Sequence, residues 1–365
     1  MPREWTGVLA ATVAVIAFGS VGGVEAGTTK LKQIGTISNP AGPIDGFDIS
    51  FVDQKTQRYY LADRSNKSVD IFDAKTDKFI GSVPGFVGVT MKNGKPDNDT
   101  SGPDGVVVVG NQVWAGDGDS TLKIIDIKSM KVVDTVSTGG KTRVDEMAYD
   151  PKDGVFIGVN NAEEPPFATL ISTGKGHKVI AKITFDDATD GAEQPAYNPA
   201  DGLFYVAIPE IKKDEKKGAV AVIDPKKGKL VKMLAVENCH PNGLAFGPGG
   251  NFALGCTANG KAMPAIITIM NAKTGKVVKE VANIGAADMV AYNPKTGQYY
   301  TGSRGMPEGP VLGIIDAKTN TLVDKVALKG GNPHSVDANH SNGHVFVPAG
   351  SANGGCGCVM VFAPQ

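Results

Sequence analysis

The sequence predicts an all-β protein, a seven-bladed β-propeller with four antiparallel strands in each blade. Three observations support this: two phrases that alternate along the chain, and one strand left over near the N-terminus. The first phrase is a hairpin whose turn reads Asp-Ala-Lys-Thr or similar, as in "IFDAKTDKFIGSV", and its copies are 45 to 53 residues apart. The second phrase, as in "MAYDPKDGVFIGV", precedes the first. Two hairpins per repeat of this length are typical of propeller blades.

The first phrase supplies the two outer strands of a blade. Its turn anchors are Asp73, Asp126, Ser172, Asp224, Asn271 and Asp316. The second phrase supplies the two inner strands and turns at Asn-Pro, Asp-Gly or Thr-Gly pairs, which adopt turn dihedral angles at little cost. Two insertions interrupt the pattern, at 87–103 and 209–219. We interpret them as either lids over a site or ordinary surface loops.

The seventh repeat stops after its third strand, at "VMVFAPQ". The missing strand is available at the other end of the chain, where "KLKQIGTIS" (30–38) has the alternation of an outermost strand. We therefore predict that this N-terminal strand pairs with the C-terminal blade and closes the ring, which leaves no long free edge.

Residues 1–26 have the features of a cleaved signal peptide. Arg3 gives a positive start, an apolar stretch follows at 8–18, and "VEA" before Gly27 resembles a cleavage site. We expect one propeller domain over 27–365, without a transmembrane anchor, because no later apolar run approaches about 18 residues. The prediction is a periplasmic or secreted monomer, in a compartment where disulfides can form.

Composition excludes some partners and cofactors. With 37 Lys and Arg against 38 Asp and Glu, the chain has no basic surplus to neutralise phosphates, so nucleic acid is not expected as the main partner. No signature of haem, NAD or PQQ binding is found, and neither are the G-x-S-x-G, H-E-x-x-H and Walker motifs.

The repeat resembles the YVTN-type propeller family across almost the whole mature chain. The segments "GHVFVPAG", "LFYVAIP" and "RYYLADR" stand where that family has its signature strand. The resemblance implies the seven-bladed fold but leaves function open, because such propellers host unrelated activities.

Polar residues gather where propeller geometry brings loops together. Loops that lead into the innermost strands and loops that leave the second strands lie on one face, around the channel mouth. The residues that precede the innermost strands are, in blade order, Asp48 beside Phe47, Asp104, Asp145, Glu193, Asn242, Asp288 and His334, with His240 two positions before Asn242. The residues that follow the second strands are Arg64, Asp117, Asn160, Glu210, Asn259 and Arg304.

These residue types support two functional hypotheses. The first is that the protein binds a small molecule or a protein partner at this face, through the residues that follow the second strands. The second is a hydrolase of the lactonase or esterase type, or a lyase. In it Asp104, Asp145, Glu193, Asn242 and Asp288 hold Ca²⁺ or Mg²⁺, and His334 or His240 acts as general acid or base. A third interpretation applies to each residue singly, because Asp and Asn before a strand often bond nearby backbone amides.

A weaker resemblance bears on the metal hypothesis. "HPNGLAF" and the polar rim are similar to the senescence-marker and gluconolactonase propellers, which implies Glu193, Asn242 and Asp288 as ligands. Those proteins generally have six blades. Streptogramin lyase is similar in its seven blades and in the use of a histidine, here His334.

The four cysteines suggest one disulfide and leave another pairing open. Cys239 and Cys256 flank one inner hairpin at the same end, which favours a bridge between them. Cys356 and Cys358 are two apart on an expected strand, so they point the same way and are awkward partners. A strained bridge, pairing across a blade, free thiols and a soft-metal site all remain open for them. His177, His340 and His344 are expected in turns on the opposite face.

Overall fold

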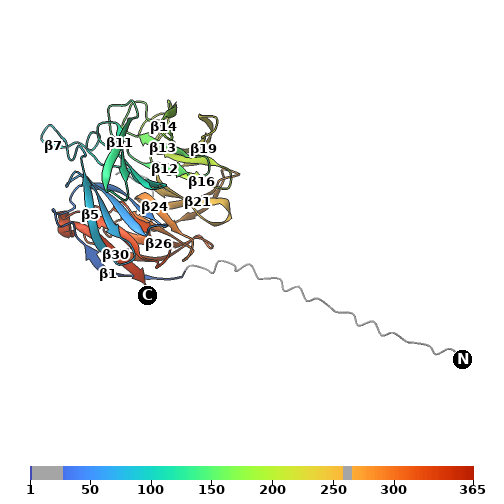
Figure 1. Ribbon diagram of the computed structural model, residues 1–365. Helices are drawn as coiled ribbons and strands as arrows, with labels where there is room; N and C mark the ends of the chain where they lie inside the picture. Colours follow the sequence, from blue (N-terminus) through green and yellow to red (C-terminus); the bar gives the residue numbers. More distant parts are fainter. Residues whose placement is uncertain (2–27, 258–264) are drawn as a thin grey trace.

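Seven four-stranded antiparallel sheets form a ring in this computed structural model, which describes Met1 and residues 28–257 and 265–365 (Figure 1). The predicted seven-bladed propeller is therefore confirmed. The expected signal peptide lies outside the described residues except for Met1, and so does Asn259. Within the described part of the chain, no helix is long and apolar enough to cross a membrane.

Each blade runs from an innermost strand to an outermost one. The first blade contains β2 (Phe47–Asp53), β3 (Arg58–Asp63), β4 (Ser68–Asp73) and β5 (Lys78–Pro84). The second contains β8 (Val106–Val109), β9 (Gln112–Gly116), β10 (Thr121–Asp126) and β11 (Lys131–Ser137). The third contains β12 (Met147–Asp150), β13 (Val155–Asn160), β14 (Phe167–Ser172) and β15 (Val179–Thr184). The fourth blade contains β16 (Pro195–Asn198), β17 (Leu203–Ile208), β18 (Lys217–Asp224) and β19 (Lys229–Glu237).

The remaining blades follow the same order. The fifth blade contains β20 (Pro241–Phe246), β21 (Asn251–Cys256), β22 (Ile267–Asn271) and β23 (Val277–Val281). The sixth contains β24 (Ala287–Asn293), β25 (Gln298–Ser303), β26 (Val311–Asp316) and β27 (Thr321–Ala327). The seventh contains β28 (Asp337–Ala338), β29 (Val345–Ala349), β30 (Cys358–Pro364) and β1 (Leu31–Ile37). Outside the blades lie a small hairpin, β6 (Met91–Lys92) and β7 (Lys95–Pro96), and two 3₁₀ turns, η1 (Pro248–Gly250) and η2 (Ala352–Gly354).

The ring closes through the N-terminal strand, as the sequence predicts. Strand β1 pairs antiparallel with β30, from Leu31 opposite Pro364 to Ile37 opposite Val359. The two strands lie side by side near the C-terminus in Figure 1. The last blade is thus built from both ends of the chain, and β30 has no free edge.

Apolar side chains from adjacent blades pack against each other and hold the ring together. Trp114 of the second blade packs on Phe156 of the third, with ring centroids 4.7 Å apart. Tyr59 of the first blade stacks on Phe346 of the seventh at 5.0 Å. Such contacts fix the rotation of one blade relative to the next. The loops before the inner strands are thereby held in one ring around the channel.

Both possible disulfides are present. Cys239 and Cys256 are bridged, as predicted, at the end of the β20 and β21 hairpin, with Cα atoms 4.9 Å apart. Cys356 and Cys358 are also bridged. The expectation that both lie on one strand was wrong, because β30 begins at Cys358 and Cys356 lies in the preceding loop. Between them Gly357 has φ +58°, a left-handed conformation that turns the chain and brings the two side chains together.

Removing the Cys239–Cys256 bridge should destabilise the fold measurably. The double substitution Cys239→Ser and Cys256→Ser should lower the free energy of unfolding by about 3 kcal/mol, the value of the loop-entropy model for a loop of this length. The matched control is Cys356→Ser with Cys358→Ser, which opens a much shorter loop and should cost about half as much. Urea denaturation measures both, and equal losses would contradict the prediction.

Candidate functional site

The loops before the inner strands surround a cavity of about 540 Å³ at one mouth of the channel. Most of its lining is polar and carries a negative excess. Six carboxyl side chains and three arginines line it: Asp45, Asp48, Asp145, Glu146, Glu193, Asp288, Arg64, Arg143 and Arg304. The neutral polar residues include Asn98, Asn242, Asn332 and His334. Eight side chains expected at the mouth are therefore brought together here, from six of the seven blades: Asp48, Arg64, Asp145, Glu193, Asn242, Asp288, Arg304 and His334.

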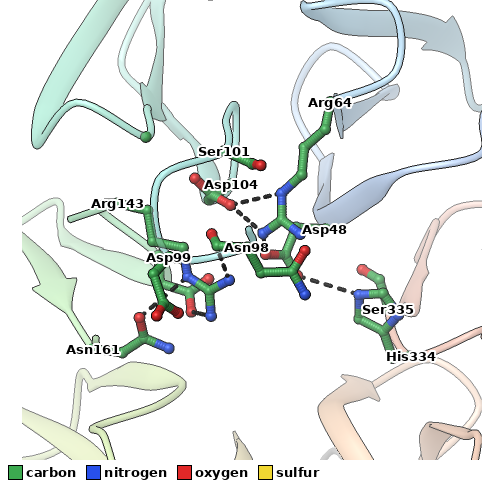
Figure 2. Close-up of polar contacts among 12 residues, drawn as sticks. Asp48, Arg64, Asn98, Asp99, Ser101, Asp104, Arg143, Asn161, His334 and Ser335 are labelled. Atoms are coloured by element: carbon green, nitrogen blue, oxygen red, sulfur yellow. Dashed lines mark hydrogen bonds and ion pairs between the residues drawn. The ribbon is translucent and has the colours of Figure 1, made fainter. Parts of the chain in front are cut away.

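Arg64 joins two buried carboxylates from neighbouring blades. It follows β3, and its Nε lies 2.8 Å from Asp104 Oδ1, while a terminal nitrogen contacts both Asp104 and Asp48 (Figure 2). Burial opposes ionisation of Asp48, yet Arg64 and His334 hold its pKa below the usual range. Burial raises the pKa of Asp104 well above the usual range despite Arg64. Asp104 lies behind this arginine and not on the cavity surface.

Arg143 makes a second ion pair and anchors the first insertion. Its guanidinium lies 2.7 Å from Asp145 and 3.2 Å from the side-chain oxygen of Asn161. It also donates to the carbonyl of Asn98, and its backbone N–H donates to the carbonyl of Asp99 at 2.8 Å. Residues of the 87–103 insertion, Asn98 among them, line the cavity. This insertion is therefore a wall of the site, whereas residues 209–219 do not line it.

His334 is held firmly at the edge of the cavity. Its ring stacks on Phe47, with centroids 4.8 Å apart and planes at 10°. Nε2 lies 3.2 Å from Asp48 Oδ1 (Figure 2). Nδ1 lies 2.7 Å from the carbonyl of Asn332. The Asp48 carboxylate therefore has two partners, Arg64 and the His334 ring, which together fix its orientation.

Two acids of the cavity, Glu146 and Glu193, form no ion pair with an arginine among the described residues. Glu146 is 3% exposed, and its Oε2 has no hydrogen-bond partner among the described residues. Burial, followed by repulsion from Glu193 and Asp145, raises the pKa of Glu146 well above the usual range. Burial, with Asp145 and Asp288, does the same to the pKa of Glu193. Burial also raises the pKa of Asp145, to about 6, against the effect of Arg143.

Asp288 and Asn242 also line the cavity. Asp288 lies 3.0 Å from Arg304, and the Asn242 amide donates to Asp288 at 3.3 Å. The Asn242 oxygen accepts from Thr257, which fixes the orientation of the amide. The ligand set implied by the gluconolactonase resemblance, Glu193, Asn242 and Asp288, therefore lines one cavity, although the donor nitrogen of Asn242 faces the carboxylate.

Four predicted residues are used by the scaffold instead. His240 is buried, with Nε2 2.8 Å from Asp190 and Nδ1 3.2 Å from Thr257, and it does not line the cavity. Asp117 forms an ion pair with Lys123. Asn160 donates to Ser120 and to the carbonyl of Thr142 at 3.0 and 3.1 Å, and Glu210 accepts from Thr189 at 2.8 Å. For these residues the interpretation as loop-fastening groups fits the structure, because each contacts local partners in the scaffold.

One group of acids has the spacing of a metal site. Carboxylate oxygens of Asp48, Asp104 and Asp145 lie within 4.8 Å of one another, the one such cluster among the described His, Cys, Asp and Glu side chains. Hard cations such as Ca²⁺ and Mg²⁺ take oxygen ligands of this kind. However, Arg64 and Arg143 already contact these oxygens, so a metal ion would have to displace a guanidinium.

Two important residues were missed by sequence reasoning. The alignment took one position per blade, and in "TRVDEMAYD" it selected Asp145. Arg143 lies two positions before it and Glu146 one position after. A signal was present, since only two of the seven repeats have a charged residue directly after the aligned position, Asp48 after Phe47 and Glu146 after Asp145. Asn98 gave no such signal because its insertion has no counterpart in the other blades.

Comparisons with known proteins support the fold. No family model matches the chain, and no curated protein matches it. Among solved structures it is similar to Kuenenia stuttgartiensis hydrazine synthase, with TM-score 0.70 and 17% identity over 90% of this chain and 98% of that one. It is also similar to the WD40 β-propeller domain of Doa1, with TM-score 0.66 and 14% identity over 92% and 97%. At such identities the likeness shows the propeller architecture, commonly a binding scaffold, and carries no activity to this chain.

Proposed function

We propose that this protein is an exported propeller that binds a positively charged group of a small molecule or protein partner at the acidic channel mouth. The observation that carries the proposal is the excess of carboxyl groups over arginines around one cavity. All three arginines there already contact an acid, while Glu146 and Glu193 have no ion-pair partner among the described residues. A bound cation would relieve that repulsion.

The electrostatics favour a cation because the acids are shielded from water. Charges interact more strongly in a site of low dielectric constant than in solution. The raised pKa values of Glu146 and Glu193 mean that a cation would promote their ionisation, so binding should release protons to solvent.

Export is part of the proposal. The two disulfides fit an oxidising compartment, as expected for a periplasmic or secreted protein. The leader-like residues 1–26 support such a location. We infer a single mature propeller domain over 27–365 that acts as a monomer.

A metal-dependent hydrolase or lyase is the second candidate, favoured by the cluster of Asp48, Asp104 and Asp145. A Ca²⁺ or Mg²⁺ ion there would supply Lewis-acid polarisation of a substrate carbonyl. His334, stacked on Phe47 at the edge of the cavity, is the group placed to exchange a proton with a substrate.

The test measures bound metal and cation affinity in the same samples. We expect the purified mature protein to contain no stoichiometric divalent ion by elemental analysis, before or after chelation. In calorimetry, putrescine should bind at least about tenfold more weakly to Asp288→Asn, because that substitution removes a charge from the mouth. The control, Asp187→Asn, changes an exposed acid outside this cavity and should bind like the wild type.

Two results would overturn parts of this proposal. Equal putrescine affinity in the Asp288→Asn and Asp187→Asn variants would place the probe elsewhere. One divalent ion per chain that is lost in Asp145→Asn, a change within the acid cluster, would favour the hydrolase or lyase and justify a screen of lactones and esters.

A further inference from the structure

A second cavity, of about 490 Å³, lies along the inner strands deeper in the channel. It is lined mainly by apolar side chains from β2, β8, β12, β16, β20 and β24, and Pro151, Pro294 and His340 lie in its lining beyond the strands. Asp337 of β28 also lines it, but its two oxygens already accept from the backbone N–H groups of Val52 at 2.6 Å and Ala338 at 2.8 Å. We call it the lower chamber. The residues that give it its shape are Phe51, Ala148, Ala196, Ala245 and Ala291.

The lower chamber exists because four successive blades place alanine at the same position. The inner-strand phrase reads "MAY", "PAY", "LAF" and "VAY" in blades three to six, and each alanine lines the chamber. Protein interiors are normally close-packed, and larger side chains at these positions would fill the space. The alanines therefore leave an apolar-lined space, and a ligand that binds the folded protein there would stabilise the fold.

Glu146 is the polar group that this chamber shares with the channel mouth, since it lines both cavities. It is 3% exposed, and its Oε2 has no partner among the described residues. Its neighbour in the lining, Gln194, is already engaged, because its Oε1 accepts from the backbone N–H groups of Leu244 at 2.6 Å and Val290 at 3.2 Å. A buried carboxyl oxygen without a donor is costly, and a ligand could supply that donor.

We propose that the lower chamber is a second binding site, which takes a small apolar molecule carrying one ammonium group. The apolar body lies against the four alanines, and the ammonium group donates to Glu146 Oε2. An ammonium group suits the site better than a neutral donor, because Glu193 and Asp145 add negative potential around Glu146. The site goes beyond the binding proposed for the mouth, since its shape is set by the alanines and not by Asp288 or Arg304.

Calorimetry with 2-phenylethylammonium tests the proposal, with 2-phenylethanol as the neutral counterpart of similar shape. We expect the ammonium probe to bind at least about tenfold more tightly than the alcohol. The variant Ala196→Leu, which fills part of the chamber, should weaken both probes at least about tenfold. Glu146→Gln keeps the shape and should remove the preference for the ammonium probe. Thermal melts of the variants without ligand confirm that each is folded, and Ala196→Val is the smaller substitution if leucine prevents folding.

Controls separate this site from the mouth. Asp288→Asn should change the affinity for 2-phenylethylammonium by less than about threefold, although it weakens putrescine. Loss of the aromatic probe in Asp288→Asn without loss in the alanine variants would overturn the lower-chamber site. So would equal affinity for the ammonium and the alcohol in the wild type. If putrescine does not bind but 2-phenylethylammonium behaves as expected, only the mouth proposal fails.

Discussion

Replacing Arg64 with methionine is expected to lower the free energy of unfolding by about 3–5 kcal/mol, the usual cost of leaving a buried charge without its partner. Arg64 contacts Asp48 in its own blade and Asp104 in the next, and Asp104 is 0% exposed. Through Asp48 the same network reaches His334 of the last blade. The substitution therefore removes the polar link between the first and second blades. Urea denaturation at pH 7 measures the loss.

Two variants serve as controls for Arg64. Arg304→Met also removes an arginine–aspartate pair, but Arg304 is partly exposed, with 32% of its side chain accessible, so the loss should be below about 1 kcal/mol. Adding Asp104→Asn to Arg64→Met removes one orphaned carboxylate and should restore part of the stability. If Arg64→Met and Arg304→Met cost the same, burial does not decide the strength of these pairs and the explanation is wrong.

The fold could be predicted because the same sequence signals recur in each blade. A single strand such as Lys131–Ser137 is short and ambiguous, but the same phrase at each blade fixes the period and thereby the architecture. The closing strand was predictable for a different reason. The last repeat lacked one strand, and an unpaired edge on β30 would be a liability.

The site was predictable only where one position per blade points to the channel. Residues before the innermost strands converge because these strands surround the axis of the ring. Asp145, Glu193 and Asp288 accordingly line one cavity. The residues after the second strands divide into two groups. Arg64 and Arg304 line the cavity, whereas Asp117 and Asn160 are held by the local partners Lys123 and Ser120.

The cysteine pair in the last blade shows the same limit. An expected strand over both residues would point Cys356 and Cys358 in one direction. The strand begins only at Cys358, and the left-handed Gly357 reverses the chain before it. A boundary error of two residues was enough to change the interpretation from awkward partners to a bridge, because side-chain direction alternates with every residue of a strand.

Glu193→Gln should remove cation binding at the mouth and at the same time stabilise the protein at alkaline pH. Burial, with Asp145 and Asp288, raises the pKa of Glu193, so the folded state holds its proton to higher pH than the unfolded chain does. Stability from such a group is fully present below the ordinary pKa and is lost as pH rises through the folded pKa. We expect the variant to be more stable than the wild type at pH 8, because glutamine carries no charge that burial and the neighbouring acids disfavour.

The pH profile separates this effect from a general change in packing. Asp145, whose pKa is raised to about 6, stays in the variant, so the fall in stability between pH 4.5 and 6.5 should persist while the fall above pH 6.5 becomes smaller. Thermal melts from pH 4.5 to 8.5 measure both ranges, and parallel profiles for the two proteins would contradict the prediction. Putrescine affinity should fall at least about tenfold in the same variant. A gain in stability together with a loss of binding is expected when like charges are held close for a ligand, because the repulsion that weakens the empty fold is the energy that a cation recovers on binding.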